Sequence, residues 1–345
     1  MNKSISIDEE GYFVLQNGIR LNDDPTGKEM LESLEVNEYG VTSMEYKNET
    51  IIVEPFDKPL VASQVYNNNN LWEIALPYQC RFSIDIESLS LDSWDRFHGL
   101  TTTGIPFVLS RKAQAEFFNL LEEFTDDSIT LNGKVIETKD YYQNSDKVNK
   151  EDFWSQKYKE HPSPPWNLNE PHPELKSILP QLKLTKRRIL VLGCGLGHDA
   201  AYIAEQGHIV TAIDISPTAI ETAQKTYSHI NNLRFEVGDI FNLDEKYYKQ
   251  FDIVFEHTLY CAISPDQRKN LIKVWRRCLE DTGHLLGIFF VNPKRTGPPF
   301  GGSEWELKNL LENSFHFLYW TRLQFSPGWR NGAELIIYAQ IKNNS

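Results

Sequence analysis

The chain has 345 residues, 24% of them charged, and a formal net charge of −13. This length exceeds what one hydrophobic core usually fills, so two domains are expected. Residues 1–150 contain 13 basic and 26 acidic residues, whereas residues 151–345 contain 22 of each. The acidic excess of the first part argues against nucleic acid or an anionic membrane as its partner.

The four cysteines have no Cys-x-x-Cys spacing, and a chain of this length does not need disulfides to stabilise a core. We therefore expect neither a disulfide nor a metal site. The N-terminus lacks the apolar run of a signal peptide, and no stretch approaches the roughly 20 apolar residues of a membrane span. These observations predict a cytoplasmic protein that does not interact with membranes, and they leave its oligomeric state open.

The first 140 residues alternate short β-type runs with turn signals, at 12–15, 40–41, 51–53, 60–66 and 71–76. The asparagine tip at 67–70 predicts a hairpin between the last two runs, and helical spacing of apolar residues predicts a helix over 113–124. We find no nucleophile–base pair or phosphate loop in this sequence. We expect an acidic α+β domain over residues 1–145, with a structural, dimerising or regulatory role, and a polar linker at 140–150.

From residue 151 the pattern changes to alternating strands and helices. Strands are predicted at 189–192, 208–213, 233–237, 252–255 and 285–291, and helices from 199, at 217–227 and at 265–279. Such alternation predicts an α/β fold, a doubly wound and mostly parallel sheet with helices on both faces and ligands at the carboxyl ends of the strands. Two later β-type runs, 315–325 and 333–341, follow a helix near 303–311 and fit a closing antiparallel pair.

A glycine-rich turn, Gly-Cys-Gly-Leu-Gly-His-Asp at 193–199, follows the first of these strands. The glycines let the backbone turn sharply at a helix N-terminus. Asp214 comes 21 residues after Gly193, at the end of the next strand, where a carboxylate can bind both ribose hydroxyls. A dinucleotide site requires Gly-x-Gly-x-x-Gly, but His198 occupies the sixth position. The spacing instead resembles the S-adenosylmethionine (SAM) loop of class I methyltransferases, so we favour SAM over NAD as the cofactor.

Three aromatic residues precede this turn. Trp154 and Tyr158 are four residues apart on a predicted helix and project from one face, and Trp166 follows the turn at 162–165. Such residues usually pack against a sheet. They can also stabilise a sulfonium cation, by roughly 0.5–2 kcal/mol each. Their place directly before the strand that leads into the glycine turn favours the second interpretation.

Four separate blocks of the second part match one known family. They are the tryptophan segment at 153–168, the glycine turn at 193–199, the strand signature Phe-Asp-Ile-Val-Phe-Glu-His at 251–257, and Gly-Pro-Pro-Phe at 297–300. With these blocks, residues 152–341 resemble the thiopurine methyltransferase superfamily, which includes thiol and halide methyltransferases. The resemblance implies a SAM-dependent methyltransferase domain over 151–345, with the Rossmann-like, seven-stranded sheet of class I. The first 150 residues lie outside it.

The resemblance also implies roles for individual residues. The cofactor would be held by Trp154, Tyr158, Trp166, Gly193, Cys194, Gly195, Asp214, Ile215, Asp239, Ile240, Glu256 and His257. Among these, Asp214 would bind the ribose and Asp239 the adenine. Arg268 and Phe300 would face the methyl acceptor, and Arg268 and His257 are the candidates for a part in the chemistry.

The same polar residues have ordinary structural interpretations. Asp239 could be a turn acid after a strand, His257 a satisfied core histidine or a proton acceptor, and Arg268 a solvated charge at a helix start. If Arg268 faces the pocket, its charge would favour a bound thiolate over the thiol. Cys194 lies inside the turn, and we do not expect it to act as a nucleophile.

We therefore expect SAM-dependent methyl transfer to a small soft nucleophile, namely a thiol, hydrogen sulfide, a thiopurine-like thiol or a halide, by in-line displacement. A thiol with a pKa of about 8.5 is already partly ionised at neutral pH, so positioning and exclusion of water can supply most of the catalysis. Two alternatives remain open. The acceptor could be an amine, an oxyanion or a metalloid, or the protein could be a SAM-binding regulator.

Overall fold

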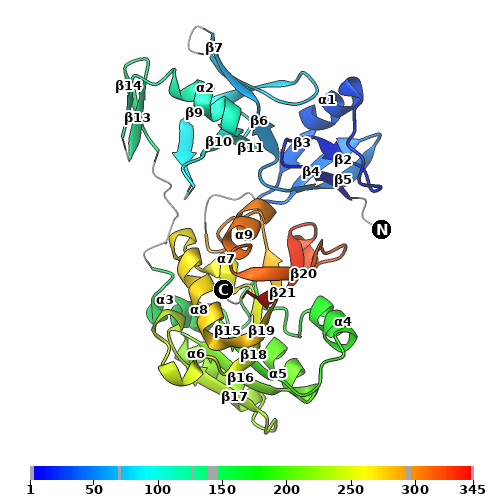
Figure 1. Ribbon diagram of the computed structural model, residues 1–345, viewed down its shortest axis with the longest axis vertical. Coiled ribbons are helices and arrows are strands. Elements are labelled where there is room, and N and C mark those ends of the chain that lie inside the picture. Colours follow the sequence, from blue (N-terminus) through cyan, green and yellow to red (C-terminus); the bar gives the residue numbers. More distant parts are fainter. Residues whose placement is uncertain are drawn as a thin grey trace. The chain divides into compact units, whose positions relative to one another are not determined.

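The computed structural model of the protein describes residues 4–68, 71–92, 94–125, 127–138, 147–292 and 297–342 (Figure 1). Within these ranges the chain forms two compact units. The first contains residues 4–138, residue 292 and residues 301–306, and the second contains the other described residues. Residues 301–306, which the sequence alone groups with the second part, thus belong to the first unit. The predicted linker at 140–150 lies outside the described residues as far as residue 146.

The first unit is built mainly of short strands. A five-stranded sheet has the order β2-β1-β5-β4-β3, with β1 Ser4–Ile7, β2 Phe13–Val14, β3 Leu34–Val36, β4 Thr42–Tyr46 and β5 Glu49–Pro55. A six-stranded sheet has the order β6-β11-β10-β9-β8-β7, with β6 Leu60–Ala62, β7 Gln64–Asn68, β8 Leu71–Ala75, β9 Arg81–Leu91, β10 Phe97–Thr101 and β11 Pro106–Leu109. A three-stranded sheet contains β12 Glu123–Phe124, β13 Ser128–Leu131 and β14 Lys134–Glu137. The helices α1 Asp24–Glu32 and α2 Arg111–Phe118 give the expected α+β composition.

The predicted hairpin of the first unit is confirmed, but one strand prediction is wrong. β7 and β8 pair antiparallel, with Gln64 opposite Ala75. The predicted run 60–66 is divided at Ser63 into β6 and β7, which lie at opposite edges of the six-stranded sheet. A continuous apolar run therefore serves two strands with different neighbours, which a local pattern does not indicate.

The helix predicted over 113–124 is too long. α2 ends at Phe118, and Asn119 forms its C-cap. Phe117 is 1% exposed, whereas Phe118 and Phe124 are exposed, and Phe124 lies in β12. The helix ends where its apolar face no longer meets a core.

The second unit contains a doubly wound sheet of seven strands in the order β17-β16-β15-β18-β19-β21-β20. The strands are β15 Arg188–Leu192, β16 Ile209–Asp214, β17 Leu233–Val237, β18 Phe251–His257, β19 Leu279–Phe290, β20 Phe315–Arg322 and β21 Glu334–Ile341. Neighbours are parallel except β21, which is antiparallel to β19 and β20. The order reverses between β15 and β18, where open α/β sheets bind ligands. The expected fold class and the closing antiparallel pair are confirmed.

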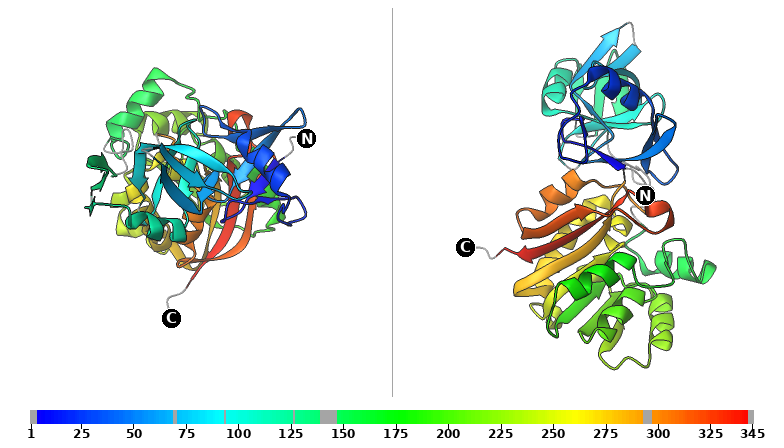
Figure 2. Two further views of the ribbon diagram at one scale, coloured as in Figure 1. Left: turned by 90° about the horizontal axis from the view of Figure 1, so that it is seen from above. Right: turned by 90° about the vertical axis from the view of Figure 1, so that its right-hand side faces the viewer.

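Alternate residues of the central strand β15 enter two separate cores. Ile189 and Val191 pack with α4 (Pro173–Gln181), α5 (His198–Glu205) and α6 (Pro217–Thr226). Leu190 and Leu192 pack with α7 (Leu259–Ala262), α8 (Arg268–Cys278) and the second half of α9 (Glu304–Leu311). Helices thus cover both faces of the sheet (Figure 2), as a strand that is apolar on both sides requires.

Three boundaries in the second unit differ from the sequence prediction. The helix predicted over 265–279 starts with a 3-10 turn, Pro265–Gln267, and continues as α8. β19 begins at Leu279, six residues before the predicted strand. The sequence prediction does not include α4, although Pro173 in its first turn and the cap by His172 are ordinary start signals.

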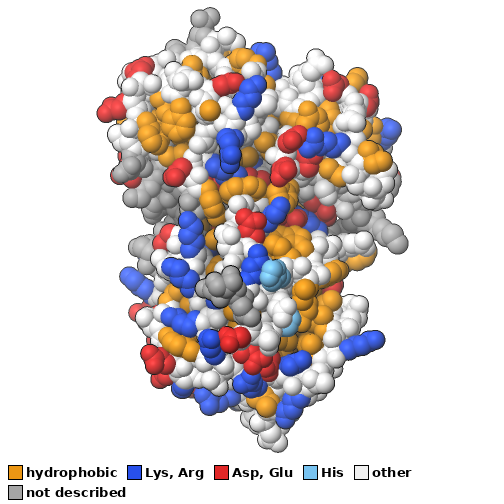
Figure 3. Space-filling view, in the orientation of Figure 1, with side chains coloured by type: hydrophobic (Ala, Val, Ile, Leu, Met, Phe, Trp, Pro, Cys, Tyr) orange, Lys and Arg blue, Asp and Glu red, His pale blue; other side chains and the backbone are white. Residues whose placement is uncertain are grey.

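The surface of the second unit carries charges of both signs. On the face drawn in Figure 3, Lys and Arg side chains are interspersed with Asp and Glu, as the equal numbers in residues 151–345 suggest. None of the helices in the described ranges combines the length and the apolar composition that crossing a bilayer requires.

Candidate active site

The predicted glycine turn joins β15 to α5 at the carboxyl edge of the sheet. Gly193, Gly195 and Gly197 have φ angles of 63°, 51° and 84°, a region that L side chains rarely adopt. Space is restricted too, because a Cβ atom on Gly193 would lie 2.7 Å from the Leu259 side chain and one on Gly197 would lie 2.6 Å from the ring of Phe235. Glycine is therefore required here by both torsion and packing.

Asp214, the last residue of β16, braces this turn. Its carboxylate accepts hydrogen bonds from the amides of Gly195 at 2.8 Å and Ser216 at 2.9 Å. The side chain is buried, and burial raises the pKa of Asp214 in spite of these bonds and one from the Ile215 amide. The amide of Cys194 donates to the Ile213 carbonyl oxygen at 3.2 Å. Part of the turn's backbone is thus paired within the chain, and the ribose contact of Asp214 stays a prediction.

The structure brings the three predicted aromatic residues together beside the glycine turn. Trp166 makes edge-on contacts with Trp154 and Tyr158, at centroid distances of 5.7 and 5.9 Å. Trp154 and Tyr158 project from α3 (Glu151–Glu160) as predicted. The Tyr158 hydroxyl lies only 2.7 Å from the place where a Cβ atom of Gly195 would be. Burial raises the pKa of Tyr158, so its phenol stays neutral.

Asp239, at the end of β17, has a local structural role. Its carboxylate accepts from the amide of Phe241 at 2.9 Å and from the side-chain amide of Asn242 at 2.6 Å, which caps the 3-10 turn Ile240–Asn242. Ile240 is buried in the core. The turn-acid interpretation of Asp239 is therefore correct, and the adenine contact stays a prediction.

Glu256 and His257 end β18, next to β15. Glu256 is 1% exposed, and its Oε1 atom accepts from the Tyr260 amide at 2.8 Å at the start of α7. Burial raises the pKa of Glu256 to about 8. This carboxyl group is therefore mostly protonated at neutral pH.

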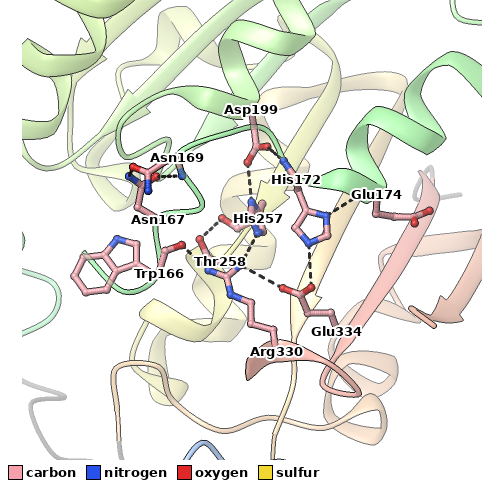
Figure 4. A network of polar contacts seen from close by, with 10 residues as sticks. All are labelled: Trp166, Asn167, Asn169, His172, Glu174, Asp199, His257, Thr258, Arg330 and Glu334. Carbon is pink, nitrogen blue, oxygen red and sulfur yellow. Dashed lines mark hydrogen bonds and ion pairs between the residues drawn. The ribbon is translucent and has the colours of Figure 1, made fainter. Parts of the chain in front are cut away.

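His257 belongs to a buried polar network (Figure 4). Its Nδ1 atom lies 2.7 Å from a carboxylate oxygen of Asp199, and its Nε2 atom lies 3.0 Å from Nη1 of Arg330. A guanidinium group can only donate, so Nε2 accepts and the ring proton is on Nδ1. His257 is thus a neutral histidine with both nitrogens occupied.

The network continues through Glu334, the first residue of β21. His172 Nε2 lies 3.0 Å from Glu334, while its Nδ1 atom accepts from the Glu174 amide. Arg330 donates to Glu334 at 3.3 Å and to the carbonyl oxygen of Trp166. Burial by itself raises the pKa of Glu334, but the bond from His172 and the Arg330 charge bring it below the usual range. Arg330 therefore links the end of β18, the start of β21 and the tryptophan segment.

The sequence analysis missed His172, Arg330 and Glu334, and it included Asp199 only within the glycine motif. Ligand atoms of His172, His257 and Glu334 lie within 4.8 Å of one another, as in a metal site. Nη1 of Arg330, however, already bonds to both His257 and Glu334. This arrangement suits a guanidinium group, because a second cation beside it would be repelled.

Arg268 is enclosed, so its interpretation as a solvated charge is wrong. It is 1% exposed, its guanidinium carbon lies 4.1 Å from the ring centroid of Tyr260, and Nη2 donates to the Phe300 carbonyl oxygen at 3.4 Å. Phe300 is fully buried, and its amide donates to the Cys261 carbonyl oxygen at 2.6 Å. The two predicted acceptor-side residues, Arg268 and Phe300, thus touch each other.

The strand order, the glycine turn and the acid at the end of the second parallel strand define a class I SAM-dependent methyltransferase. The sequence profile of the thiopurine S-methyltransferase (TPMT) family matches residues 149–333, more than half of the chain. The chain belongs to this family, and SAM is its cofactor.

Individual relatives are distant. "Probable thiol methyltransferase 2" of Arabidopsis thaliana is 30% identical over 176 residues, which cover 49% of this chain and 76% of that protein. The 2-heptyl-1-hydroxyquinolin-4(1H)-one methyltransferase of Mycobacteroides abscessus is 28% identical, over 48% of this chain and 71% of that protein. A solved structure from a study of the conversion of a disulfide bond into a thioacetal group in echinomycin biosynthesis matches with a TM-score of 0.49 and 20% identity, over 56% of this chain and 94% of that one.

Proposed function

We propose that this protein transfers the methyl group of SAM to the sulfur of a small thiol or of hydrogen sulfide. The names of the family and of the Arabidopsis relative both specify sulfur acceptors. The name of the Mycobacteroides relative specifies a hydroxyquinolone, which makes an acidic hydroxyl the second candidate acceptor.

The observation that carries the proposal is the state of the acid–base groups. Both nitrogens of His257 are occupied, Nδ1 by Asp199 and Nε2 by Arg330. Glu256, with a pKa of about 8, keeps its proton at neutral pH, and burial raises the pKa of the Cys194 thiol. The site residues described above therefore offer no ready proton acceptor. An alcohol or an ammonium group needs one, whereas a thiol is already partly ionised and strongly nucleophilic.

When bound, SAM supplies a methyl group on a positively charged sulfur, which the acceptor attacks in line. The three aromatic rings of Trp154, Tyr158 and Trp166 suit such a cation. Asp214 has carboxylate lone pairs beyond those that the amides of Gly195 and Ser216 use, and these can accept ribose hydroxyls. The residues present therefore fit the cofactor.

Arg268 and Phe300 are the proposed acceptor-side pair. Stacking on Tyr260 and the bond to the Phe300 carbonyl oxygen hold the Arg268 guanidinium in place. A fixed positive charge away from water lowers the pKa of a neighbouring thiol. Arg268 would thus ionise the acceptor without taking its proton.

The test is an acceptor panel with the full-length protein and SAM, with S-adenosylhomocysteine formation as the measurement. The panel contains sulfide, thiophenol, iodide, a primary amine and 2-heptyl-1-hydroxyquinolin-4(1H)-one. We expect turnover with the sulfur acceptors and none with the amine. Turnover with the quinolone alone would select the second candidate. Binding of SAM without turnover of any acceptor would contradict the proposal and favour a SAM-sensing regulator.

A further inference from the structure

Residues 301–306 connect the methyltransferase sequence to the first unit. The chain enters this segment directly after Phe300, which belongs to the second unit, and leaves it along α9. A short segment of the methyltransferase sequence has therefore become part of the first unit's structure.

Hydrogen bonds hold this segment in the first unit. The Ser303 hydroxyl donates to a carboxylate oxygen of Asp57 at 3.0 Å, and the Trp305 amide donates to the Phe56 carbonyl oxygen at 2.9 Å. Asp57 and Ser303 are both buried, 6% and 4% exposed. Buried hydrogen bonds to a charged group are among the stronger ones in proteins.

The Trp305 ring is held as well. The guanidinium carbon of Arg96 lies 3.3 Å from its centroid, and Trp94 contacts its edge at 5.2 Å. Arg96 also donates to Asp57 at 2.6 Å, so one arginine joins the stacked ring to the carboxylate that binds Ser303. We call Asp57, Arg96, Ser303 and Trp305 the Trp305 anchor.

On the other side of the connection, Phe300 is fixed in the second unit. Its amide donates to Cys261 and its carbonyl oxygen accepts from Arg268. Three residues of chain extend at most about 11 Å, so a displacement of Ser303 is passed on to Phe300. The Trp305 anchor and the contacts of Phe300 therefore constrain the same short stretch from both ends.

We propose that Asp57 and Arg96 of the first unit are positioning residues for the methyl acceptor, because the Trp305 anchor holds the Phe300 segment in place. This inference rests on the proposed function in one respect, the assignment of Arg268 and Phe300 to the acceptor side. It gives the first unit, which contains no SAM-binding motif, a role in the reaction.

The first experiment measures the link without any acceptor. Amide hydrogen exchange of the peptide that contains Phe300 is followed in the full-length protein and in Arg96→Met. The matched control is Arg81→Met, since Arg81 also stacks on an aromatic ring of the first unit, that of Tyr66 at 4.3 Å. We expect exchange at Phe300 to be at least about fivefold faster in Arg96→Met, the lower end of typical coupling between sites, and unchanged in Arg81→Met. Ser303→Ala provides a second test if Arg96→Met does not fold.

The second experiment measures the consequence for the reaction. With sulfide as the acceptor, we expect Arg96→Met to raise KM at least about fivefold, while the Kd for SAM in calorimetry changes less than twofold. Unchanged exchange at Phe300 in both anchor variants overturns the inference, whatever the acceptor proves to be. Faster exchange with an unchanged KM overturns the placement of Phe300 at the acceptor, and thus that part of the proposed function.

Discussion

Glu256 provides a direct test of the electrostatics of the site. Its carboxyl group is 1% exposed, and burial raises its pKa from 4.5 to about 8. Because the pKa is higher in the folded protein than in the unfolded chain, this stability contribution is fully present below about pH 4.5 and is lost as the pH rises toward 8. At about 1.4 kcal/mol for each pKa unit, the loss amounts to roughly 3–5 kcal/mol.

Glu256→Gln removes this titration. The amide keeps the oxygen that accepts from Tyr260, and it adds N–H donors at the buried place of Oε2, which has no partner among the described residues. The variant is therefore destabilised by a constant amount at every pH. Against that offset, we expect the free energy of unfolding of the wild type to fall by roughly 3–5 kcal/mol relative to the variant between pH 5 and pH 8.5.

Urea unfolding at several pH values between 5 and 8.5 measures this difference. Glu221→Gln, which changes an exposed glutamate of α6, is the matched control and should run parallel to the wild type. If the curves of the wild type and Glu256→Gln are also parallel, Glu256 is ionised at neutral pH. The argument that the site lacks a free base would then fail.

Three further variants test other parts of the site. Arg330→Met leaves a buried carboxylate and His257 without their donor, so we expect a loss of about 3–5 kcal/mol, against less than about 1 kcal/mol for Arg188→Met in a half-exposed ion pair; equal losses in thermal unfolding would show that the polar network adds no stability. Asp214→Ala should weaken SAM binding by about 1–3 kcal/mol in calorimetry, and binding of NAD by the wild type would contradict the cofactor assignment. Arg268→Met should move the rise of the sulfide methylation rate to higher pH and leave SAM affinity nearly unchanged; an unaltered pH profile would remove Arg268 from the acceptor side.

Parts of this fold in which neighbouring residues act together were predictable from the sequence. The apolar run at 189–192 alternates between two cores, and the glycine turn that follows it has the positive φ angles that its composition indicates. β17 has the predicted limits, 233–237. In each case the determining contacts lie within a few residues of the chain or follow from strand alternation.

The polar network of Arg330 could not be predicted in this way. Its members come from α4, α5, β18 and the start of β21, and His172 and Glu334 are 162 residues apart in the chain. Each of them, taken alone, is an ordinary polar residue. Only the sheet order, which places β21 beside β19 and β19 beside β18, brings them together. Asp239 failed in the opposite sense, because its local capping bonds are a sufficient reason for an acid after a strand.

The place of residues 301–306 also has a consequence for synthesis on the ribosome. More than 160 residues separate residue 138 from residue 301, which at about 5–20 residues per second means a delay of roughly 8–30 s. Until residue 306 has emerged, Arg96 and Trp94 lack the ring on which they pack. Translation order and structural order therefore differ, and we expect the first unit to reach its final form only after strands β15 to β19 of the second have been made.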